Sequence, residues 1–458
     1  MNRKGFLLFH ILLGFLGVYV NDFSTIYGVS VFLFAFFQVL RTSNKTGWAH
    51  LGAVYIIGME VWLRMTKASL FWEFGKIASI TLLALGLIAQ RSLFKKPVFL
   101  LLIALLIPSI FLAGNLDFDT FRQSLTFQLG GLILLSFSTI YFYKRPFDVK
   151  RFQQILLFFI GPIIATIIQI TLKSPSLSNI AFQLGSNFEE SGGFGPNQVS
   201  TILGIGIICI GINFLFRMPP FFSKPVDLAL LTLFIFRGLL TFSRGGLVTA
   251  VISLFITYIL LQYEKGFSLR RIFTPVILAA LVVFSFIIVN NITGGALLDR
   301  YKGETYSTKL GYEDLSISKV TTGRFDIIMS DLNMWRENPI LGVGVGVSNL
   351  LRPGFGVENI SHTEQSRLLA EHGILGLIVI FIIVFTFIKN FQKRKGIQRA
   401  ILILFFLVSF LTMFHSATRL AITGFIYGMG FLYLIFPNED NSIYRKQTFK
   451  QRIFTHNY

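Results

Sequence analysis

Apolar runs of roughly 16–22 residues, separated by short polar segments, recur along almost the whole sequence. A helix needs about 20 apolar residues to cross the hydrocarbon core of a bilayer, so most of these runs suit one span each. The chain is 53% hydrophobic and 14% charged, and a soluble protein of this composition would expose much apolar surface to water. The pattern therefore predicts an all-α polytopic membrane protein with about 12–14 transmembrane helices.

The order of these runs divides the chain into four regions. Residues 1–291 hold about eleven predicted transmembrane helices, and residues 292–371 form one long loop outside the cytoplasm. Residues 372–436 hold the last three predicted transmembrane helices, and residues 437–458 form a basic tail. The predicted spans lie at about 5–20, 24–40, 48–65, 75–90, 97–114, 124–143, 152–172, 198–216, 226–242, 245–262, 273–291, 373–389, 399–415 and 420–436.

Positive charges alternate from loop to loop. The net charge of +19 would suggest a nucleic acid partner for a soluble protein. Here Lys and Arg concentrate in every second loop and in the tail, as the positive-inside rule requires of cytoplasmic segments. We therefore expect a multi-pass membrane protein with both termini in the cytoplasm, membrane lipids as partners and no nucleic acid partner. The charged start MNRK and the apolar run behind it lack a cleavage site and are interpreted as a retained first span.

The long loop 292–371 is expected on the outer side of the membrane, where long loops often carry function. It is slightly acidic, although the whole chain is strongly basic. Apolar residues from Phe325 to Trp335 recur in it at helical spacing. This spacing predicts an amphipathic helix that lies on the membrane domain and ends before Asn338.

Three places on the expected outer side combine a basic side chain with the start of a helix. Arg244 lies in the turn SRGG, Arg324 opens the amphipathic helix, and His362 lies in SHTE before the next span. A helix N-terminus offers free N–H donors, and arginine adds a fork of donors that matches phosphate oxygens. These residues predict a site for a diphosphate-bearing substrate. The plainer alternative is that the arginines only reach lipid headgroups and that His362 is an ordinary loop histidine.

Several other charged residues have a structural alternative that is at least as good. Arg237 lies inside a predicted span and Arg419 in the last outward loop, so each is a candidate for substrate contact or for an interfacial arginine. Glu60 and Arg64 are one helical turn apart and are expected to form an internal pair. Glu190 is expected in solvent.

The segment around His362 allows three further predictions. Ser361 and Glu364 have capping-box spacing, which places His362 in the first turn of the span that follows, and His372 is expected at the membrane interface. The glycine-rich stretch 341–349 has neither dinucleotide-binding nor Walker spacing, and we expect it to serve tight packing or close approach of backbone to substrate. Since the sequence shows neither metal-ligand spacing nor a cofactor motif, we expect no metal site and no cofactor.

The stretch after His362 resembles the bacterial O-antigen ligase and O-antigen polymerase superfamily. The family pattern is His, then Asn, Ser or Gln, then nine residues, then Gly-x-x-Gly. Here His362 is followed by Thr363, nine residues, and then Gly373 and Gly376. Thr363 departs from the usual second position but keeps a hydrogen-bonding side chain.

Three other stretches add to this resemblance, which covers roughly residues 190–380. The turn SRGG with Arg244 and the loop segment that starts at Arg324 are similar to family segments that precede the histidine. FGPNQVST, which contains Asn197, is similar to the family's Pro-Asn stretch. The resemblance makes Asn197, like Arg237 and Arg419, a candidate for substrate binding. The first half of the chain is similar to the family only in hydropathy.

The resemblance implies an inverting glycosyl transfer at the outer face of the bacterial inner membrane. The donor would be a glycan linked to undecaprenyl diphosphate, and the acceptor would be a sugar hydroxyl on an acceptor glycan or glycolipid. Arg244 and Arg324 would bind the diphosphate, and His362 would orient or deprotonate the acceptor hydroxyl. Neither a metal ion nor another cofactor would be needed.

The acceptor distinguishes two reactions within the superfamily. A polymerase transfers the glycan to another lipid-linked repeat unit, and a ligase transfers it to lipid A-core. The number of predicted spans and the lack of an added soluble domain slightly favour a polymerase. A flippase or transporter of lipid-linked oligosaccharides is the alternative from another class, and it would place substrate groups near the bilayer midplane.

Overall fold

The structure, a computed structural model, describes most of the chain. The described residues are 2–68, 71–114, 118–175, 182, 184–266, 269–304, 306–309, 311–312, 314, 316–352 and 361–436, without the side chains of 265, 269–271, 273–274 and 306–307. The predicted basic tail 437–458 lies outside these residues. The chain is 77% helical, and its elements are as follows.

The helices of the bundle are α1 (Arg3–Tyr19), α2 (Phe23–Thr42), α3 (Trp48–Met65), α4 (Phe74–Ala89), α5 (Val98–Leu106), α6 (Pro108–Leu112), α7 (Phe118–Ser124), α8 (Gly130–Phe142), α9 (Val149–Lys173), α10 (Pro196–Leu215), α11 (Lys224–Leu240), α12 (Arg244–Lys265), α13 (Leu269–Ile292), α19 (Glu364–Lys393), α20 (Gly396–His415) and α21 (Ala421–Met429). The long loop contains α14 (Ala296–Lys302), α15 (Tyr306–Lys309), α16 (Ile317–Thr321), α17 (Arg324–Glu337) and α18 (Ser348–Leu351). Short elements are the 3-10 turns η1 (Leu93–Lys95) and η4 (Glu189–Ser191), the π-helical turn η2 (Leu125–Leu129), and the strands β1 (Pro146–Asp148) and β2 (Tyr433–Ile435).

The predicted fold class is confirmed, since the chain is an all-α polytopic membrane protein. Eight helices in the described part are long and apolar enough to cross a membrane by length and composition. They are Phe23–Thr42, Phe118–Phe142, Val149–Lys173, Pro196–Leu215, Arg244–Glu264, Pro275–Ile292, Glu364–Lys393 and Gly396–His415. Because the other bundle helices are shorter or more polar, the count of 12–14 spans stays a prediction.

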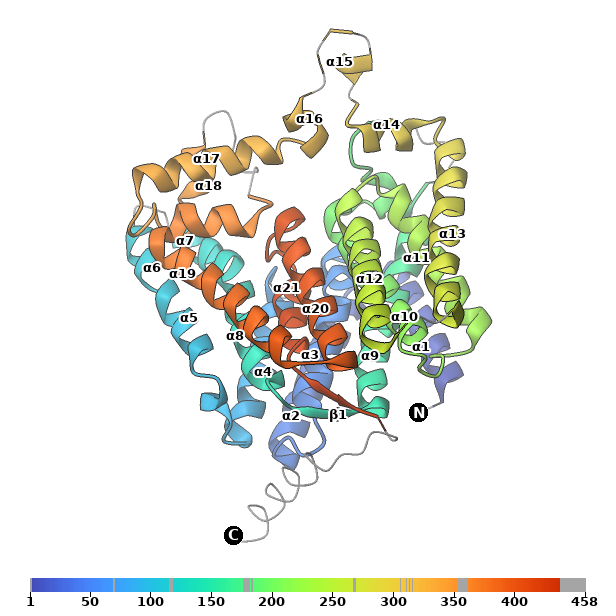
Figure 1. Ribbon diagram of the computed structural model, residues 1–458, viewed down its shortest axis with the longest axis horizontal. Coiled ribbons are helices and arrows are strands. Elements are labelled where there is room, and N and C mark those ends of the chain that lie inside the picture. Colours follow the sequence, from blue (N-terminus) through green and yellow to red (C-terminus); the bar gives the residue numbers. More distant parts are fainter. Residues whose placement is uncertain are drawn as a thin grey trace.

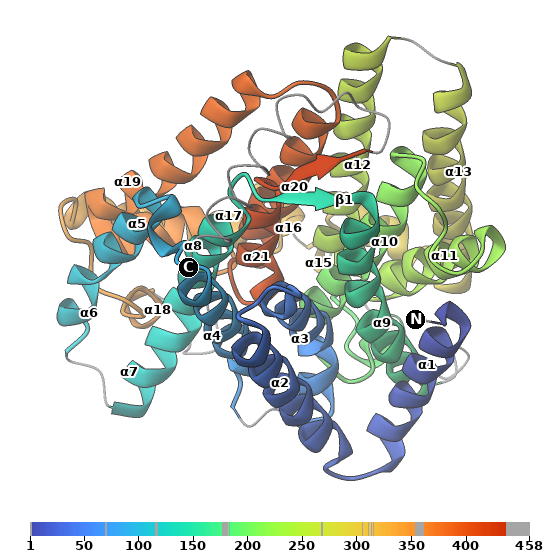
Figure 2. The same ribbon diagram turned by 90° about the horizontal axis from the view of Figure 1, so that it is seen from below.

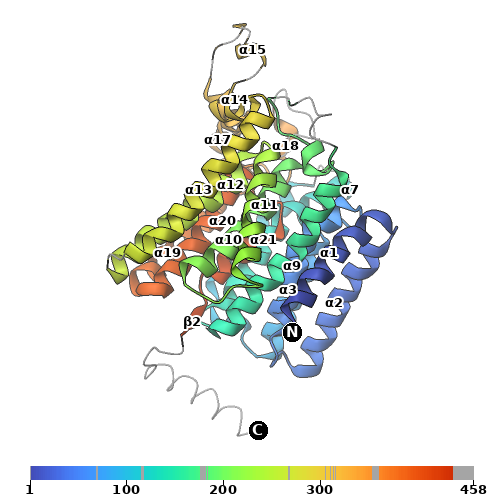
Figure 3. The ribbon, with the colours of Figure 1, turned by 90° about the vertical axis from the view of Figure 1, so that its right-hand side faces the viewer.

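The helices of the long loop gather at one end of the bundle, which we call the loop end (Figure 1). There α17 lies across the ends of the bundle helices and packs against α19. The strands β1 and β2 lie at the opposite end, as does the start of α1 (Figures 2 and 3). The two strands pair in parallel, with Phe147 opposite Leu434.

The predicted amphipathic helix is present as α17 and ends at Glu337, directly before Asn338. Its buried face differs from the predicted one, because it carries Ile327, Asp331 and Met334, whereas Phe325 is 40% exposed. Asp331 is buried because its carboxylate accepts hydrogen bonds from Arg352 and Ser366 of the neighbouring segments. An apolar pattern cannot reveal such a polar anchor.

The predicted span 420–436 is wrong in its second half. Helix α21 ends at Met429, and the chain then turns at Gly430 and extends into β2. Arg394 donates to the backbone carbonyls of Gly430, Phe431 and Leu432 at 2.9, 2.7 and 3.1 Å. These bonds and the pairing with β1 satisfy carbonyl groups that a continuing helix would otherwise have used.

Candidate functional site

The three residues predicted to form a site all lie at the loop end. Arg244 is the first residue of α12, Arg324 is the first residue of α17, and His362 lies two residues before α19 (Figure 1). Arg244 Nη2 donates to the backbone oxygen of Val320 at 2.6 Å, and its Nη1 donates to that of Tyr301 at 3.4 Å. These bonds hold the Arg244 guanidinium between α14 and α16. Helix α16 ends shortly before Arg324.

A third arginine, which the sequence analysis missed, joins this group from α14. Burial and the charges of Arg244 and Arg324 lower the pKa of Arg300 to about 10. Burial and the charge of Arg244 likewise lower the pKa of Arg324 to about 10. Together with the bonds from Arg244 to the backbone of Tyr301, next to Arg300, and of Val320, this repulsion indicates that the three guanidinium groups lie near one another. We call Arg244, Arg300 and Arg324 the arginine cluster.

The arginine cluster has no carboxylate to balance it in the part of the chain that the structure describes. None of its members forms an ion pair with a described residue. The Nε atoms of Arg300 and Arg324 are buried and find no hydrogen-bond partner in the described part of the chain. Three adjacent cations without counter-charges create a strong positive potential, which favours a multiply charged anion. Arg300 was missed because DRYK resembles an ordinary stretch of solvated charges.

His362 is held by its backbone, and the Nδ1 of its ring has no hydrogen bond to a described residue. The N–H of Ala417 donates to the His362 backbone oxygen at 3.0 Å. The ring is half-buried. Burial, followed by the charges of Arg419, Arg324, His415 and Arg352, lowers the pKa of His362 well below its ordinary value. The imidazole is therefore neutral at pH 7 and lies in the field of the arginines.

Asn197 lies at the start of α10 and is bonded to the end of α20. Its Nδ2 donates to the backbone oxygen of His415 at 2.7 Å, and its Oδ1 lies 3.2 Å from His415 Nδ1. A Cβ at Gly245 would lie 2.4 Å from Cγ and Nδ1 of the His415 ring, which is a steric overlap, so only glycine leaves room for the ring. Gly245 of SRGG thus allows His415 to pack against α12. No local sequence pattern marks His415, because its hydrogen-bond partners lie far away in the chain.

Arg237 and Glu190 form an ion pair, with Nη1 and Oε2 2.7 Å apart. The expectation that Glu190 is solvated is wrong, since its side chain is fully buried. An arginine at the end of a bundle helix needs a counter-charge once it is removed from solvent, and Glu190 supplies it. The pair occupies Arg237 and leaves it a weaker candidate for substrate contact.

The predicted capping box at the start of α19 is absent. The residue that caps the helix is Thr363, whose Oγ1 bonds to Ser366 Oγ at 2.7 Å and not to a backbone N–H of the first turn. His362 therefore lies before the helix, whereas the capping box had predicted it in the first turn. Ser361 Oγ instead bonds to the Thr363 backbone oxygen at 3.0 Å and to Asp331 Oδ2 at 3.4 Å. Glu364 forms an ion pair with Arg367, since a buried carboxylate is stabilised more by a cation than by a backbone N–H.

Asp331 anchors α17 to the segment that carries His362. Its Oδ1 accepts from Arg352 at 2.6 Å and its Oδ2 from Ser366 at 2.7 Å. Arg352 and Asp331 are both fully buried at the side chain. This polar contact fixes the helix of Arg324 relative to the His362 segment.

The glycine-rich stretch of the loop packs against a break in α19. Gly373 has φ 60° and ψ −136°, so the helix is interrupted there. Ile374 N–H donates to the backbone oxygen of Pro339 at 2.8 Å, and Val343 N–H donates to that of Ala370 at 2.9 Å. The loop therefore satisfies groups that the break frees, and tight packing is confirmed as its role. The neighbouring His372, expected at the interface, is fully buried beside this break.

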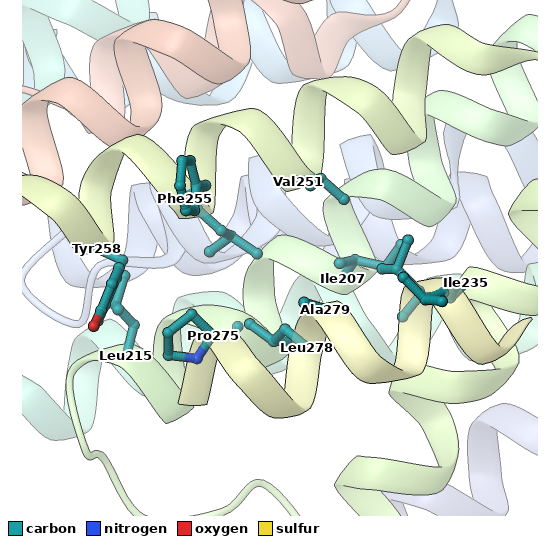
Figure 4. Close-up of a pocket in the computed structure, with 13 residues that line it drawn as sticks. Ile207, Leu215, Ile235, Val251, Phe255, Tyr258, Pro275, Leu278 and Ala279 are labelled. Carbon is teal, nitrogen blue, oxygen red and sulfur yellow. The ribbon is translucent and has the colours of Figure 1, made fainter. Parts of the chain in front are cut away.

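An apolar cavity of about 200 Å³ lies among α10, α11, α12 and α13 (Figure 4). Its lining includes Val251, Leu254 and Phe255 of α12 and Pro275 of α13. Since almost no polar atom faces it, the cavity suits a hydrocarbon chain rather than a sugar. Arg244 begins the same helix, seven residues before Val251, which is about 10 Å along a helix axis.

The described residues include no group of three or more His, Cys, Asp or Glu side chains arranged to hold a metal ion. Independence from metal ions therefore remains a prediction.

Comparison with known proteins gives one family match. Residues 228–381 match a protein-family model described as O-antigen ligase. The match spans Arg237, the arginine cluster and His362, and it confirms the resemblance seen in the sequence. No curated protein matches the chain.

Proposed function

We propose that this chain, which belongs over residues 228–381 to the O-antigen ligase and polymerase superfamily, transfers a glycan from undecaprenyl diphosphate to a sugar hydroxyl. The family supports a membrane enzyme of the glycosyltransferase type that uses lipid-linked glycans. The proposal adds the donor, the inverting stereochemistry, the independence from metal ions and the roles of individual residues. It also places the site at the outer face of the cytoplasmic membrane, with both termini in the cytoplasm.

The observation that carries this proposal is the unbalanced charge of the arginine cluster beside a neutral histidine. The donor has a diphosphate, which carries two negative charges when it is esterified on both sides. Arg244 and Arg324 offer forked donors to its oxygens, and Arg300 adds a third cation next to them. The same charges would stabilise the diphosphate as it leaves, when its negative charge increases.

The proposed reaction is a direct displacement at the anomeric carbon. The acceptor oxygen forms a bond to that carbon while the bond from the carbon to the diphosphate oxygen breaks. The electron pair of the broken bond remains on the diphosphate, beside Arg244 and Arg324. The hydroxyl proton passes to the neutral ring of His362, which lies within the same group of residues. Attack from the face opposite the leaving group inverts the configuration.

The apolar cavity gives the hydrocarbon part of the donor a place in this proposal. A diphosphate at Arg244 would lie at one end of α12, and its polyprenyl chain would extend along that helix toward Val251 and Phe255. Such a chain buries apolar surface at about 25 cal/mol per Å², so a long carrier adds affinity without any polar contact.

The acceptor remains a choice between two classes. We retain the slight preference for a lipid-linked repeat unit, which makes the protein a polymerase, over lipid A-core, which would make it a ligase. Loss of long chains with single repeats still attached, after deletion of the protein, would support the polymerase. Accumulation of lipid-linked polymer with an unmodified core would support the ligase.

The direct test is a transfer assay with purified protein in proteoliposomes, a lipid-linked glycan and an acceptor. We expect a new glycosidic bond of inverted configuration in the presence of EDTA, and loss of product with His362→Ala and Arg324→Ala. Arg300→Gln should raise the KM for the donor on the order of 10-fold, because one charge-assisted contact is lost. Lys302→Gln is the matched control, since this exposed lysine lies on the same short helix.

Two results would contradict the proposal. Normal transfer by correctly inserted His362→Ala protein would remove the histidine from the mechanism. Movement of the lipid-linked glycan between leaflets without a new bond would indicate a flippase, the alternative from another class.

A further inference from the structure

A short segment between α20 and α21 carries Arg419 and is bonded to a buried carboxylate of α19. We call residues 416–421 the Arg419 segment. Glu364 Oε2 accepts hydrogen bonds from both the N–H and the Oγ1 of Thr418, each at 3.1 Å. The other oxygen of Glu364 is paired with Arg367. The Glu364 carboxylate thus links Arg367, on its own helix, to the Arg419 segment.

A second buried carboxylate holds the same segment from α3. Glu60 Oε2 accepts from the N–H of Ala421 at 2.8 Å, across 361 residues of sequence. Glu60 Oε1 is paired with Arg64 Nη2 at 2.7 Å, which confirms the internal pair expected from the sequence. Arg64 also donates to Gln198 Oε1 at 2.8 Å and more weakly, at 3.4 Å, to the backbone oxygen of Arg419.

The two arrangements have the same design. Each carboxylate uses one oxygen for an arginine one turn further along its own helix and the other oxygen for the Arg419 segment. All four charged side chains are at most 3% exposed, so none of them is available to substrate. In a surrounding of low polarity, such bonds are strong and their geometry is well defined. The proposed transfer reaction itself gives neither pair a role.

The Arg419 segment contacts the residues of the proposed reaction, since the N–H of Ala417 donates to the His362 backbone oxygen at 3.0 Å. The charge of Arg419 is the largest electrostatic contribution, after burial, to the lowered pKa of His362, and Arg324 contributes to the lowered pKa of Arg419 itself. Its side chain is half-buried, in contrast to those of Glu60 and Glu364. A bound anion between Arg324 and His362 would therefore lie next to Arg419.

We infer that Arg419 is a further ligand of the donor diphosphate and that Glu60 and Glu364 are positioning residues, which act on the substrate only through the Arg419 segment. This inference rests on the proposed diphosphate site but not on the transfer reaction. It links the first half of the chain, through α3, to a site whose other residues lie in the second half.

The test is a double-mutant cycle on the affinity for farnesyl diphosphate, a soluble polyprenyl diphosphate, measured by calorimetry with the full-length protein in detergent. Arg419→Gln should weaken binding on the order of 10- to 100-fold, because a charge-assisted contact is lost. Glu60→Gln and Glu364→Gln should each weaken it several-fold. In the Arg419→Gln background the same changes should have no further effect, since the residue they position is gone.

Matched controls separate positioning from general stability. Asp227→Asn alters another buried carboxylate, which accepts from the backbone N–H groups of Phe221 and Phe222 at 2.7 and 3.0 Å and has no bond to the Arg419 segment. It should leave the affinity unchanged. Thr418→Val removes only the Oγ1 donor to Glu364 and leaves the ion pair intact, so it should weaken binding even if Glu364→Gln protein does not fold.

Effects of Glu60→Gln or Glu364→Gln that persist in the Arg419→Gln background would overturn the inference, as would equal effects of Asp227→Asn. Absence of farnesyl diphosphate binding by the wild-type protein would also overturn it. Binding with the expected coupling but without glycan transfer would support the inference and contradict the proposed function, so the two failures are distinguishable.

Discussion

The electrostatic surroundings of the His362 ring depend on whether the site holds an anion. Without one, burial and then the charges of Arg419 and Arg324 disfavour the imidazolium, and the pKa lies far below 6.5. A ring with so low a pKa is a weak base. A bound diphosphate would offset the arginine charges and raise the pKa of His362. The ring would then become a better proton acceptor only when the donor is in place, which would limit unproductive chemistry.

This charge dependence predicts a shift in the pH profile of the reaction. The acidic limb of kcat/KM reports the free enzyme, so for the wild type it should lie below the ordinary histidine pKa of 6.5. Arg419→Gln removes a cation that repels the imidazolium, so protonation becomes easier and the limb should move to higher pH. Lys302→Gln, at an exposed position of the loop end, should leave the limb in place. An identical acidic limb in wild type and Arg419→Gln would show that His362 does not control it.

Among the elements, α19 shows how two motif glycines and a loop depend on each other. A helix break inside a membrane protein leaves backbone groups that must be satisfied within the protein. At Gly373 the loop residues Pro339 and Val343 supply those bonds. The second motif glycine, Gly376, lies so close to the backbone oxygen of Leu368 that a Cβ would overlap it. The Gly-x-x-Gly pattern therefore encodes a bent helix with a docked loop, and it places the His362 end of α19 at an angle to the rest.

This account predicts that Gly373→Ala is more harmful than an ordinary glycine substitution. A Cβ at Gly373 would lie 2.5 Å from the carbonyl carbon of Ile340 and 2.7 Å from Gly342 N. The backbone conformation of Gly373, with φ 60° and ψ −136°, costs a residue with a side chain about 1–3 kcal/mol, and the overlap costs about 1–3 kcal/mol more. Thermal unfolding in detergent should therefore show a lower midpoint, together with lost transfer. The control is Gly396→Ala, which has φ +56° but open space around the new Cβ. Equal shifts for both variants would contradict the packing role of the loop.

At the scale of the whole molecule, local patterns predicted the elements but not the contacts between distant segments. Apolar runs predicted most bundle helices, and motif spacing predicted the placing of Arg244, Arg324 and His362 at helix starts. Arg300 was not predicted, because no local pattern distinguishes a cation that faces two others from a solvated one.

The bond from Glu60 to the Arg419 segment also lies beyond local patterns, since it joins residues 361 positions apart. The predicted span 420–436 failed for a related reason. Its apolar residues suit a helix, but Arg394 and β1 provide alternative partners for its backbone. Burial and pairing across the bundle decide such cases, and only the three-dimensional arrangement reveals them.

The orientation of the molecule in the membrane leads to the last prediction. The loop end holds the arginine cluster, and α3 runs from the basic turn at Lys45 to Arg64, which contacts the Arg419 segment. The charge alternation predicts that the Lys45 end faces the cytoplasm. The native Cys209 is only 2% exposed, so thiol reagents should report introduced cysteines almost alone.

We therefore expect Tyr312→Cys, at a position that is 79% exposed at the loop end, to react with a membrane-impermeant maleimide in intact spheroplasts. Lys45→Cys, exposed at the opposite end, should react only after the membrane is permeabilised. Detergent-treated samples of both variants provide the control for thiol reactivity. If Lys45→Cys were labelled before Tyr312→Cys, the molecule would have the opposite orientation in the membrane. The arginine cluster would then face the cytoplasm, where positive charge in loops needs no substrate to explain it.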